Sequence, residues 1–303
     1  MAVPVTTALS ITAALAVTEY TDPACPWAWG TEPKLRWLRL RLATSGTPVR
    51  WRRVFGILFD EGDDPAPDPD AEAAWYAGFI ARVAEHTGAP HAGRLGWLTR
   101  SSWPASLAGT AALAQGDEVG ALVVRRLRES TFIAGTPADD EPGIRRAVTG
   151  VPGLDVDRLL ADLATAADAV RADHAETRRP CAEVLAIAEP GPHSGRAKEI
   201  DGGVRYALPT LVFAGPGGRF VVPGWRPLRQ YVDAVRNAAG IQLEPGPPLT
   251  AAQALARYET VTGPELALLA GVDRAPGVAV PTANGPLWIA EDRLGSWERA
   301  WDR

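Results

Sequence analysis

The stretch DPACPWAWG, residues 22–30, places Cys25 between a short apolar run and a segment with a helical pattern. Residues 14–20, before it, have the length and composition of a buried strand. Residues 27–42, after it, carry leucines on one helical face and arginines on the other. A run of β-branched and aromatic residues, 49–59, follows a turn-forming break and predicts another strand. This part of the chain therefore predicts a strand, a helix and a strand, with a cysteine at the first junction.

The position of Cys25 predicts a reactive thiol. A helix N-terminus offers unpaired backbone N–H groups and the positive end of the helix dipole, and both favour a thiolate. Pro26 suits the first helical position, where no hydrogen bond is lost. Turns of this kind normally read Cys-x-x-Cys, but Ala28 occupies the second place here. Without a second thiol, another molecule must resolve any mixed disulfide that Cys25 forms.

The rest of the chain predicts three further parts. A polar, proline-rich linker at 61–69 leads into a long helical stretch, about 68–190. Strand patterns return at 204–215 and 218–224, separated by GPGG, which suits a tight hairpin. A helix that ends at Gly240 closes this unit.

Two distant motifs, together with this order of elements, carry a resemblance to a known family. DPACPW follows the first predicted strand, and ALPTLVF lies at residues 207–213. Over roughly 14–240 the chain resembles the DsbA superfamily, especially its FrnE-like and DsbA-like members. The resemblance implies an α/β thioredoxin fold with a large helical insertion, a cis peptide bond at Pro209, and thiol-disulfide oxidoreductase activity. It also implies that the loss of the second cysteine disfavours disulfide formation in client proteins.

Residues 246–303 predict a small C-terminal helical appendage that is winged-helix-like. Two short helical patterns are followed by a possible wing at 285–294. Pro276, Gly277 and Pro281 interrupt the expected recognition helix, and the segment is acidic, which argues against contact with DNA. Packing, dimerisation or covering of a pocket are the roles that fit this appendage better.

The composition excludes several function classes. A net charge of -5 gives no basic footprint for nucleic acid. No run approaches the ~20 apolar residues of a membrane span. The first 17 residues lack the positive charge of a secretory signal, so we expect a cytoplasmic protein. Two cysteines cannot build a disulfide framework, and the four histidines show no metal-binding spacing, so no metal site is expected.

The function predicted from these patterns is thiol-disulfide exchange through a single cysteine. Cys25 is the expected nucleophile, and no tightly bound cofactor is expected. A low-molecular-weight thiol, mycothiol or glutathione, is the expected resolving partner, and a homodimer is left open. The residues expected to bind the substrate surround the cysteine and the predicted cis-proline, with one tryptophan from the insertion. They are Pro26, Trp27, Ala28, Trp29, Trp103, Leu208, Pro209 and Thr210.

Two alternatives remain open. Kappa-type thiol transferases and chromene-carboxylate isomerases of the same superfamily also lack the second cysteine. An aromatic pocket around Trp27, Trp29 and Trp103 would suit such chemistry. The second alternative is a non-catalytic binding module on a redox scaffold, in which Cys25 is an inert core residue. Cys181, after Pro180, is either a resolving thiol or a small buried residue.

Overall fold

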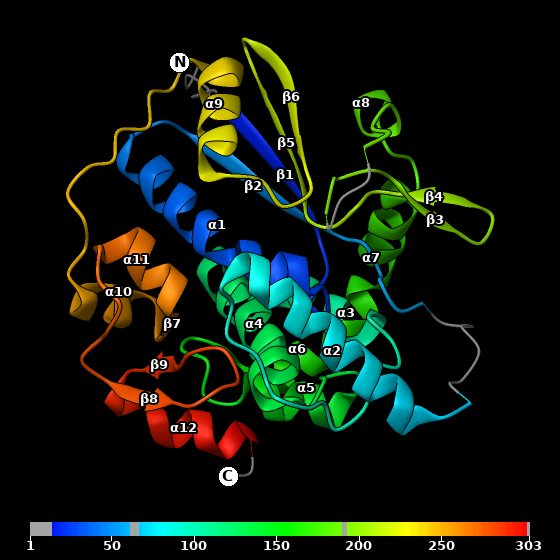
Figure 1. Ribbon diagram of the computed structural model, residues 1–303, viewed down its shortest axis with the longest axis vertical. Helices are drawn as coiled ribbons and strands as arrows, with labels where there is room; N and C mark the ends of the chain where they lie inside the picture. The colour runs from blue at the N-terminus through cyan, green and yellow to red at the C-terminus, as the bar shows by residue number, and fades with distance from the viewer. Residues whose placement is uncertain (1–13, 61–66, 190–192, 302–303) are drawn as a thin grey trace, which may run out of the picture.

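The structure, a computed structural model, describes residues 14–60, 67–189 and 193–301 (Figure 1). Residues 1–13, which bear on the expected absence of a secretory signal, therefore lie outside the described residues. So does most of the predicted linker at 61–69. Within the described ranges, no helix is long and apolar enough to cross a membrane.

The centre of the molecule is a four-stranded sheet in the order β2-β1-β5-β6. Its strands are β1 (Leu15–Thr21), β2 (Val49–Phe55), β5 (Thr210–Gly215) and β6 (Gly218–Pro223). β1 and β2 are parallel, and β5 is antiparallel to both β1 and β6. The strand–helix–strand unit predicted from the sequence is therefore present, with helix α1 (Pro26–Thr44) as its crossover.

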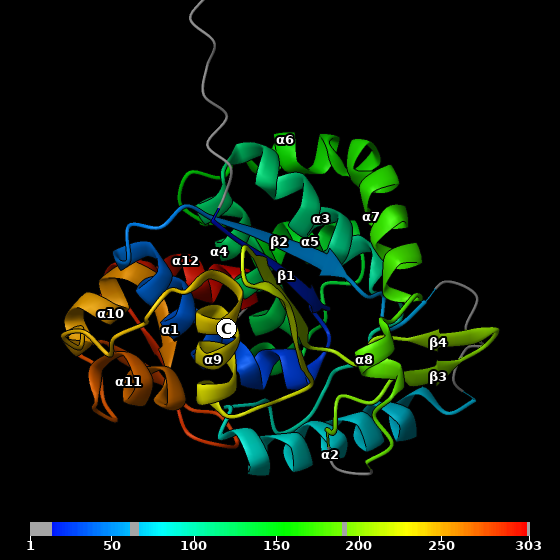
Figure 2. The same ribbon diagram turned by 90° about the horizontal axis from the view of Figure 1, so that it is seen from above.

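Helices cover both faces of this sheet. Figure 2 shows α1 and α9 (Leu228–Ala239) on one side and α3 (Trp103–Ala112) and α7 (Leu163–Thr177) on the other. On the α1 side, the apolar side chains of alternate strand residues pack against both helices. This core contains Leu15, Val17, Leu35, Leu38, Leu211, Phe213, Tyr231 and Val235. Because α1 is clamped between the sheet and the rest of the molecule, the position of its N-terminus, and so of Cys25, is set by this core.

The helical insertion forms as the sequence predicts. Its helices are α2 (Pro69–Thr87), α3 (Trp103–Ala112), α4 (Asp117–Glu129), α5 (Glu141–Val148), α6 (Val156–Ala161), α7 (Leu163–Thr177) and α8 (Ala182–Leu185). The caps explain several boundaries. The Asp68 carboxylate accepts a hydrogen bond from the Ala71 N–H at the start of α2, and Gly88 ends this helix with a φ of 70°.

The predicted strand 204–215 is wrong in one respect, because the structure divides it. A short hairpin of β3 (Lys198–Ile200) and β4 (Gly203–Arg205) ends at Arg205, and β5 begins only at Thr210. The Leu208–Pro209 peptide bond between them is cis. Proline has no N–H to donate to a sheet ladder, so the strand cannot run continuously through this position.

The C-terminal segment contains a small sheet as well as helices. Its elements are α10 (Ala251–Tyr258), β7 (Thr260–Thr262), α11 (Gly263–Ala270), β8 (Val278–Val280), β9 (Leu287–Ile289) and α12 (Glu291–Trp301), and the sheet order is β7-β9-β8. Its apolar residues also pack against other parts of the molecule. Leu287, Ile289 and Trp297 pack in one cluster with Trp29 of α1 and Phe132 of the insertion.

A buried cluster of arginines and glutamates also joins this segment to α1 and α4. Glu265 of α11 pairs with Arg125 at 2.8 Å and with Arg36 at 3.1 Å. On α4, Arg128 pairs with Glu32 of α1, and Glu129 accepts hydrogen bonds from Thr260 and from the Trp297 indole. We call the set Glu32, Arg36, Arg125, Arg128, Glu129 and Glu265 the α1–α4–α11 ion cluster.

Candidate functional site

Cys25 lies at the junction of β1 and α1, beside the loop that carries the cis peptide bond. It is the N-cap residue of α1, and its carbonyl accepts the Trp29 N–H at 3.0 Å. The Cys25 side chain is only 4% exposed. Its Sγ donates to the Leu208 carbonyl oxygen across 3.5 Å. The structure thus brings together Cys25, Leu208 and Pro209, which lie 183 residues or more apart along the chain.

The expected low pKa of Cys25 is contradicted by its surroundings. Burial raises the pKa of the thiol to about 11, and the charge of Asp22 adds to that effect. The backbone N–H groups of Ala28 and Trp27 and the charge of Arg205 act in the opposite direction, but they do not outweigh burial. The helix N-terminus therefore does act on the sulfur as expected. It fails to produce a thiolate because water is excluded from the site.

Asp22 is a site residue that the sequence reasoning missed. Its carboxylate is fully buried and accepts hydrogen bonds from the N–H groups of Ala24 and Leu58, each at 2.8 Å, and from the Ser102 hydroxyl at 3.1 Å. Burial raises its pKa. Asp22 therefore fixes the cysteine turn to the end of β2 and to the insertion. The Asp-Pro pair that opens the motif is the sequence signal for such a turn.

His193 is a second missed residue. Its Nε2 lies 2.5 Å from the Leu208 carbonyl oxygen, so this nitrogen carries the hydrogen. Burial lowers the pKa of His193 to about 4, which keeps the imidazole neutral. The Leu208 carbonyl consequently accepts from both Cys25 and His193. No local pattern marks His193, because its partner lies 15 residues away.

Trp27 lies among aromatic rings beside the cysteine. Its indole meets the His193 ring edge-on at 4.8 Å and lies 5.9 Å from His86 and 6.4 Å from Trp225. Together with Cys25 it belongs to an apolar cluster that also contains Tyr20, Val83, Tyr206 and Leu208. Trp27 is 7% exposed, so this aromatic group is packed against the site and not displayed to solvent.

Other expected substrate-binding residues serve as packing. Trp29 stacks on Phe132 at 5.8 Å and donates to the Pro90 carbonyl, so it lies in the core shared with the C-terminal segment. The Trp103 indole donates to Asp60 and lies against His174. The expected aromatic pocket of Trp27, Trp29 and Trp103 is therefore not formed.

The remaining residues of that expected set are buried. Pro26 and Ala28 form the first turn of α1, and Ala28 has no exposed surface. The Thr210 hydroxyl is used internally, because it donates to the Ala207 carbonyl at 2.7 Å. Cys181 caps α8, where its N–H donates to the Tyr206 hydroxyl, and its thiol is partly exposed.

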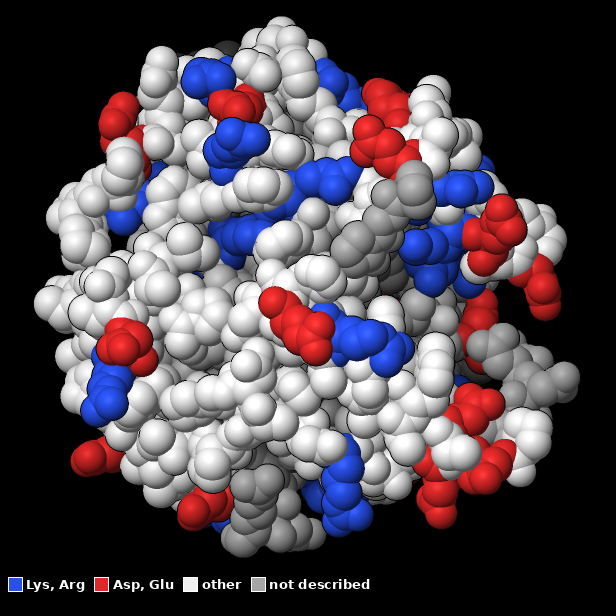
Figure 3. All heavy atoms as spheres, viewed as in Figure 1, with Lys and Arg blue, Asp and Glu red and all other residues white. Residues whose placement is uncertain are grey.

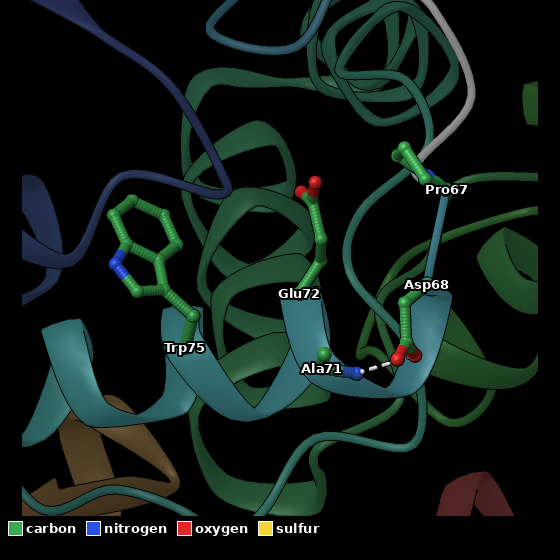
Figure 4. A pocket seen from close by; sticks show the side chains of 5 residues that line it. All are labelled: Pro67, Asp68, Ala71, Glu72 and Trp75. Atoms are coloured by element: carbon green, nitrogen blue, oxygen red, sulfur yellow. Dashed lines mark hydrogen bonds between the residues drawn. The ribbon is translucent and has the colours of Figure 1, made fainter.

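Two larger cavities lie away from Cys25. One of about 490 Å³ opens at the start of α2 and is lined by Pro67, Asp68, Ala71, Glu72 and Trp75 (Figure 4). Another of about 640 Å³ lies between α1, β2, α4 and α10. In the latter, Arg39 lies over the Trp51 ring at 4.3 Å and Arg36 over the Tyr258 ring at 4.5 Å. Within the described ranges no group of three or more His, Cys, Asp or Glu residues is arranged to hold a metal ion.

Sequence comparison gives two adapter proteins. The chain is 27% identical over 271 residues to the ClpXP adapter protein SpxH of Halalkalibacterium halodurans, which covers 84% of this chain and 78% of that protein. It is 28% identical over 169 residues to the SpxH protein of Shouchella clausii, which covers 52% of each chain. The chain matches no protein-family model.

Solved structures similar to this one are thiol-disulfide proteins. A putative protein disulfide isomerase from Nitrosomonas europaea superimposes with a TM-score of 0.53 at 14% identity, over 73% of this chain and 95% of that one. A probable DsbA oxidoreductase from Streptomyces coelicolor gives a TM-score of 0.50 at 18% identity, over 78% and 93%. The chain therefore adopts the DsbA-like thioredoxin fold, which is the fold of thiol-disulfide oxidoreductases.

Proposed function

We propose that this chain is a protein-binding adapter built on a DsbA-like scaffold, one that presents partner proteins to an ATP-dependent protease of the ClpXP type. The observation that carries the proposal is the similarity to the SpxH adapter of Halalkalibacterium halodurans, which extends over 84% of the chain. The second alternative raised by the sequence, a binding module on a redox scaffold, is thereby preferred to catalysis.

The state of Cys25 supports this proposal. Ala28 replaces the second thiol, and the remaining one is 4% exposed with its pKa raised to about 11. At pH 7 a thiol with that pKa is ionised to roughly one part in ten thousand. A redox enzyme relies on an accessible thiolate, whereas an adapter needs only the shape of the scaffold.

The attachment of the C-terminal segment supports it as well. The α1–α4–α11 ion cluster and the shared core at Trp29 and Trp297 join the segment to the thioredoxin unit. An adapter must hold its partner protein at a fixed position relative to the protease. A firm junction between two units meets that need better than a flexible linker does.

The test is a comparison of protein levels in five strains of the host: wild type, a strain depleted of ClpX, a deletion of this gene, a deletion complemented by the wild-type chain, and one complemented by Cys25→Ala. We expect a small set of proteins to accumulate in the deletion strain and in a strain depleted of ClpX. Both complementing chains should return that set to its normal level. No overlap between the two accumulated sets would refute the adapter function.

A second candidate function is favoured by one contact. Cys25 lies at the N-terminus of α1 with its Sγ against the Leu208 carbonyl, beside the cis peptide bond, as a thiol-exchange site requires. In this candidate the Cys25 thiolate attacks a mixed disulfide between a substrate and a low-molecular-weight thiol, and the substrate leaves as a thiolate. A second molecule of that small thiol then attacks the Cys25 mixed disulfide, giving the small-thiol disulfide and free Cys25.

Intact-mass spectrometry of the Cys181→Ser protein tests the second candidate. Incubation with oxidised glutathione or mycothiol disulfide should add one small thiol to Cys25 within minutes at pH 8. A chain that stays unmodified until it is denatured would leave only the adapter function. The kappa-type or isomerase alternative would need an aromatic pocket beside Cys25. The contacts of Trp29 and Trp103 do not support one, because their indoles donate to Pro90 and Asp60.

A further inference from the structure

The β3–β4 hairpin places two cations directly opposite each other. Lys198 pairs with Arg205 in the antiparallel register, so both side chains lie on the same face. Glu199 pairs with Val204 and faces the other way, where it bridges to Arg196 at 3.8 Å. Like charges at directly opposed positions destabilise a strand pair. An anion bound between Lys198 and Arg205 would relieve that repulsion.

Among the described residues neither cation forms a close ion pair with a carboxylate, although the charge of Asp22 acts on Arg205 from further away. The hydrogen bond that Arg205 makes is to the Tyr206 carbonyl, at 2.9 Å. Burial lowers the pKa of Arg205 and of Lys198, and their mutual repulsion lowers that of Lys198 further. Arg205 is half-buried and Lys198 is exposed, and two like charges on one face of a hairpin repel each other.

The neighbours of both cations in the chain belong to the apolar cluster around Cys25, because Ala197 precedes Lys198 and Tyr206 follows Arg205. Arg205 directly precedes Tyr206, whose ring lies in the apolar cluster of Cys25 and Trp27. The charge of Arg205 lowers the pKa of both Cys25 and Asp22, although burial, which raises each pKa, outweighs it. Figure 3 shows basic side chains gathered near the base of the hairpin on the face viewed there.

We propose that Lys198 and Arg205 form a carboxylate-binding site beside Cys25, and that its occupant is an acidic side chain of a bound partner protein. The guanidinium of Arg205 supplies a planar, two-pronged donor, and the Lys198 ammonium supplies a second charge. The choice of a partner segment as occupant rests on the proposed adapter function. The binding of a carboxylate rests on the hairpin alone.

A different role for the two cations would be to stabilise the Cys25 thiolate. The geometry argues against it, because the thiol already uses its hydrogen on the Leu208 carbonyl and remains protonated despite Arg205. A cation pair placed for that role would leave the sulfur with a low pKa. The charges are instead available to a group that arrives from outside.

The composition makes a direct measurement simple. The chain has only two lysines, Lys34 and Lys198. Reductive methylation with ¹³C-formaldehyde keeps the charge of lysine and gives one signal for each in a ¹H–¹³C NMR spectrum, besides that of the N-terminal amine. Lys34 donates to the Arg226 carbonyl at 2.6 Å and serves as the internal control. The Lys198→Arg variant assigns the signals.

The titrants are two matched peptides, N-acetyl-Gly-Glu-Gly-amide and N-acetyl-Gly-Gln-Gly-amide. We expect the glutamyl peptide to move the Lys198 signal saturably and to leave Lys34 unmoved. The glutaminyl peptide should bind at least tenfold more weakly. Arg205→Gln should weaken the glutamyl peptide about tenfold, as the loss of a charged hydrogen bond predicts. The matched control Arg236→Gln should leave its affinity unchanged, because Arg236 pairs with Asp233 on α9 and its charge acts on neither Lys198 nor Arg205.

Equal affinity for the two peptides, or no effect of Arg205→Gln on a folded protein, would overturn the proposal. S-methylglutathione distinguishes the source of the carboxylate. If it saturates the Lys198 signal while the glutamyl peptide does not, the assignment to a partner protein is wrong and the second candidate function gains support. Because the titration contains no protease, it can succeed or fail independently of the adapter test.

Discussion

Two neighbouring parts of helix α1, its N-terminus and the turn around Glu32, differ in which form of a buried polar group they favour. At its N-terminus, burial raises the pKa of Cys25 to about 11 and also raises that of Asp22, so neutral forms are favoured there. Two turns further along, in the ion cluster, burial also raises the pKa of Glu32, but Arg128 and its neighbouring arginines outweigh it and hold that pKa at about 2. The difference is the supply of counter-charges. The chain retains the shape of a thiol site, but it concentrates its buried charges where the C-terminal segment joins.

The largest expected effect comes from breaking the ion cluster at Glu265. Glu265→Gln keeps the capping interaction with Thr262 but leaves Arg36 and Arg125 without their shared carboxylate. We expect a loss of about 3–5 kcal/mol in the free energy of unfolding, because uncompensated buried charges remain. Urea denaturation measures it. The control Asp157→Ala removes an exposed ion pair with Arg145 and should change stability by less than about 1 kcal/mol. Equal losses in the two variants would show that the cluster contributes no more to the free energy of unfolding than an exposed ion pair does.

The second largest effect is expected from low pH, which should weaken the same ion cluster. The pKa of Glu32 falls from 4.5 in the unfolded chain to about 2 in the folded one, and those of Glu19 and Glu129 are also lowered. A lowered folded-state pKa gives stability that is present above pH 4.5 and is lost as pH falls towards 2. Glu32 alone should contribute about 3 kcal/mol to that loss. Urea midpoints measured at pH 7, 4 and 3 test this. Glu32→Gln should flatten the dependence, and an unchanged slope would contradict the assignment.

At the N-terminus of α1, thiol reactivity tests the other half of the comparison. In the native protein at pH 7.5, we expect Cys25 to react with a neutral alkylating reagent at least a hundredfold more slowly than Cys181, since its pKa is raised and its side chain is 4% exposed. Below pH 11 the rate at Cys25 should rise about tenfold per pH unit. Peptide mapping by mass spectrometry separates the two sites. Denaturation should make the two rates similar, and a fast native Cys25 would restore the enzymatic candidate.

The smallest effect is expected at Trp75, outside both regions. Trp75 is 62% exposed on α2, where its ring stacks on Phe79. Trp75→Ala should alter the free energy of unfolding by about 0.5 kcal/mol or less, because little buried area is lost. The same urea series gives the value. A loss comparable to that of Glu265→Gln would mean that α2 packs differently from the arrangement in Figure 4.

The sequence predicted the elements that local patterns encode. The strand, the cysteine and α1 follow from hydrophobic periodicity, and the approach of Leu208 to Cys25 followed from the resemblance carried by ALPTLVF. The raised pKa of Cys25 could not be predicted, because burial is a property of the packed cluster and not of the motif. The partners His193 and Arg205 were missed for a similar reason. They reach the site through tertiary structure from a segment with no distinctive pattern.

The C-terminal segment shows a further limit of sequence reasoning. Its helices and wing-like strands carry local signals, but its attachment does not. Glu265, Arg125 and Arg36 are separated by at least 89 residues along the chain, and each of them alone reads as a solvent-exposed charge. Only the folded structure shows that they share one buried site.

The burial of Cys25 should protect its thiol from oxidation by peroxide. Peroxide attacks thiolates that solvent can reach, and it converts them first to sulfenic acid and then to irreversible acids. A protonated sulfur that is 4% exposed and already engaged with the Leu208 carbonyl is a poor target for that reaction. The chain would in this way keep its shape, and with it its binding surfaces, in a cell whose exposed thiols are being oxidised.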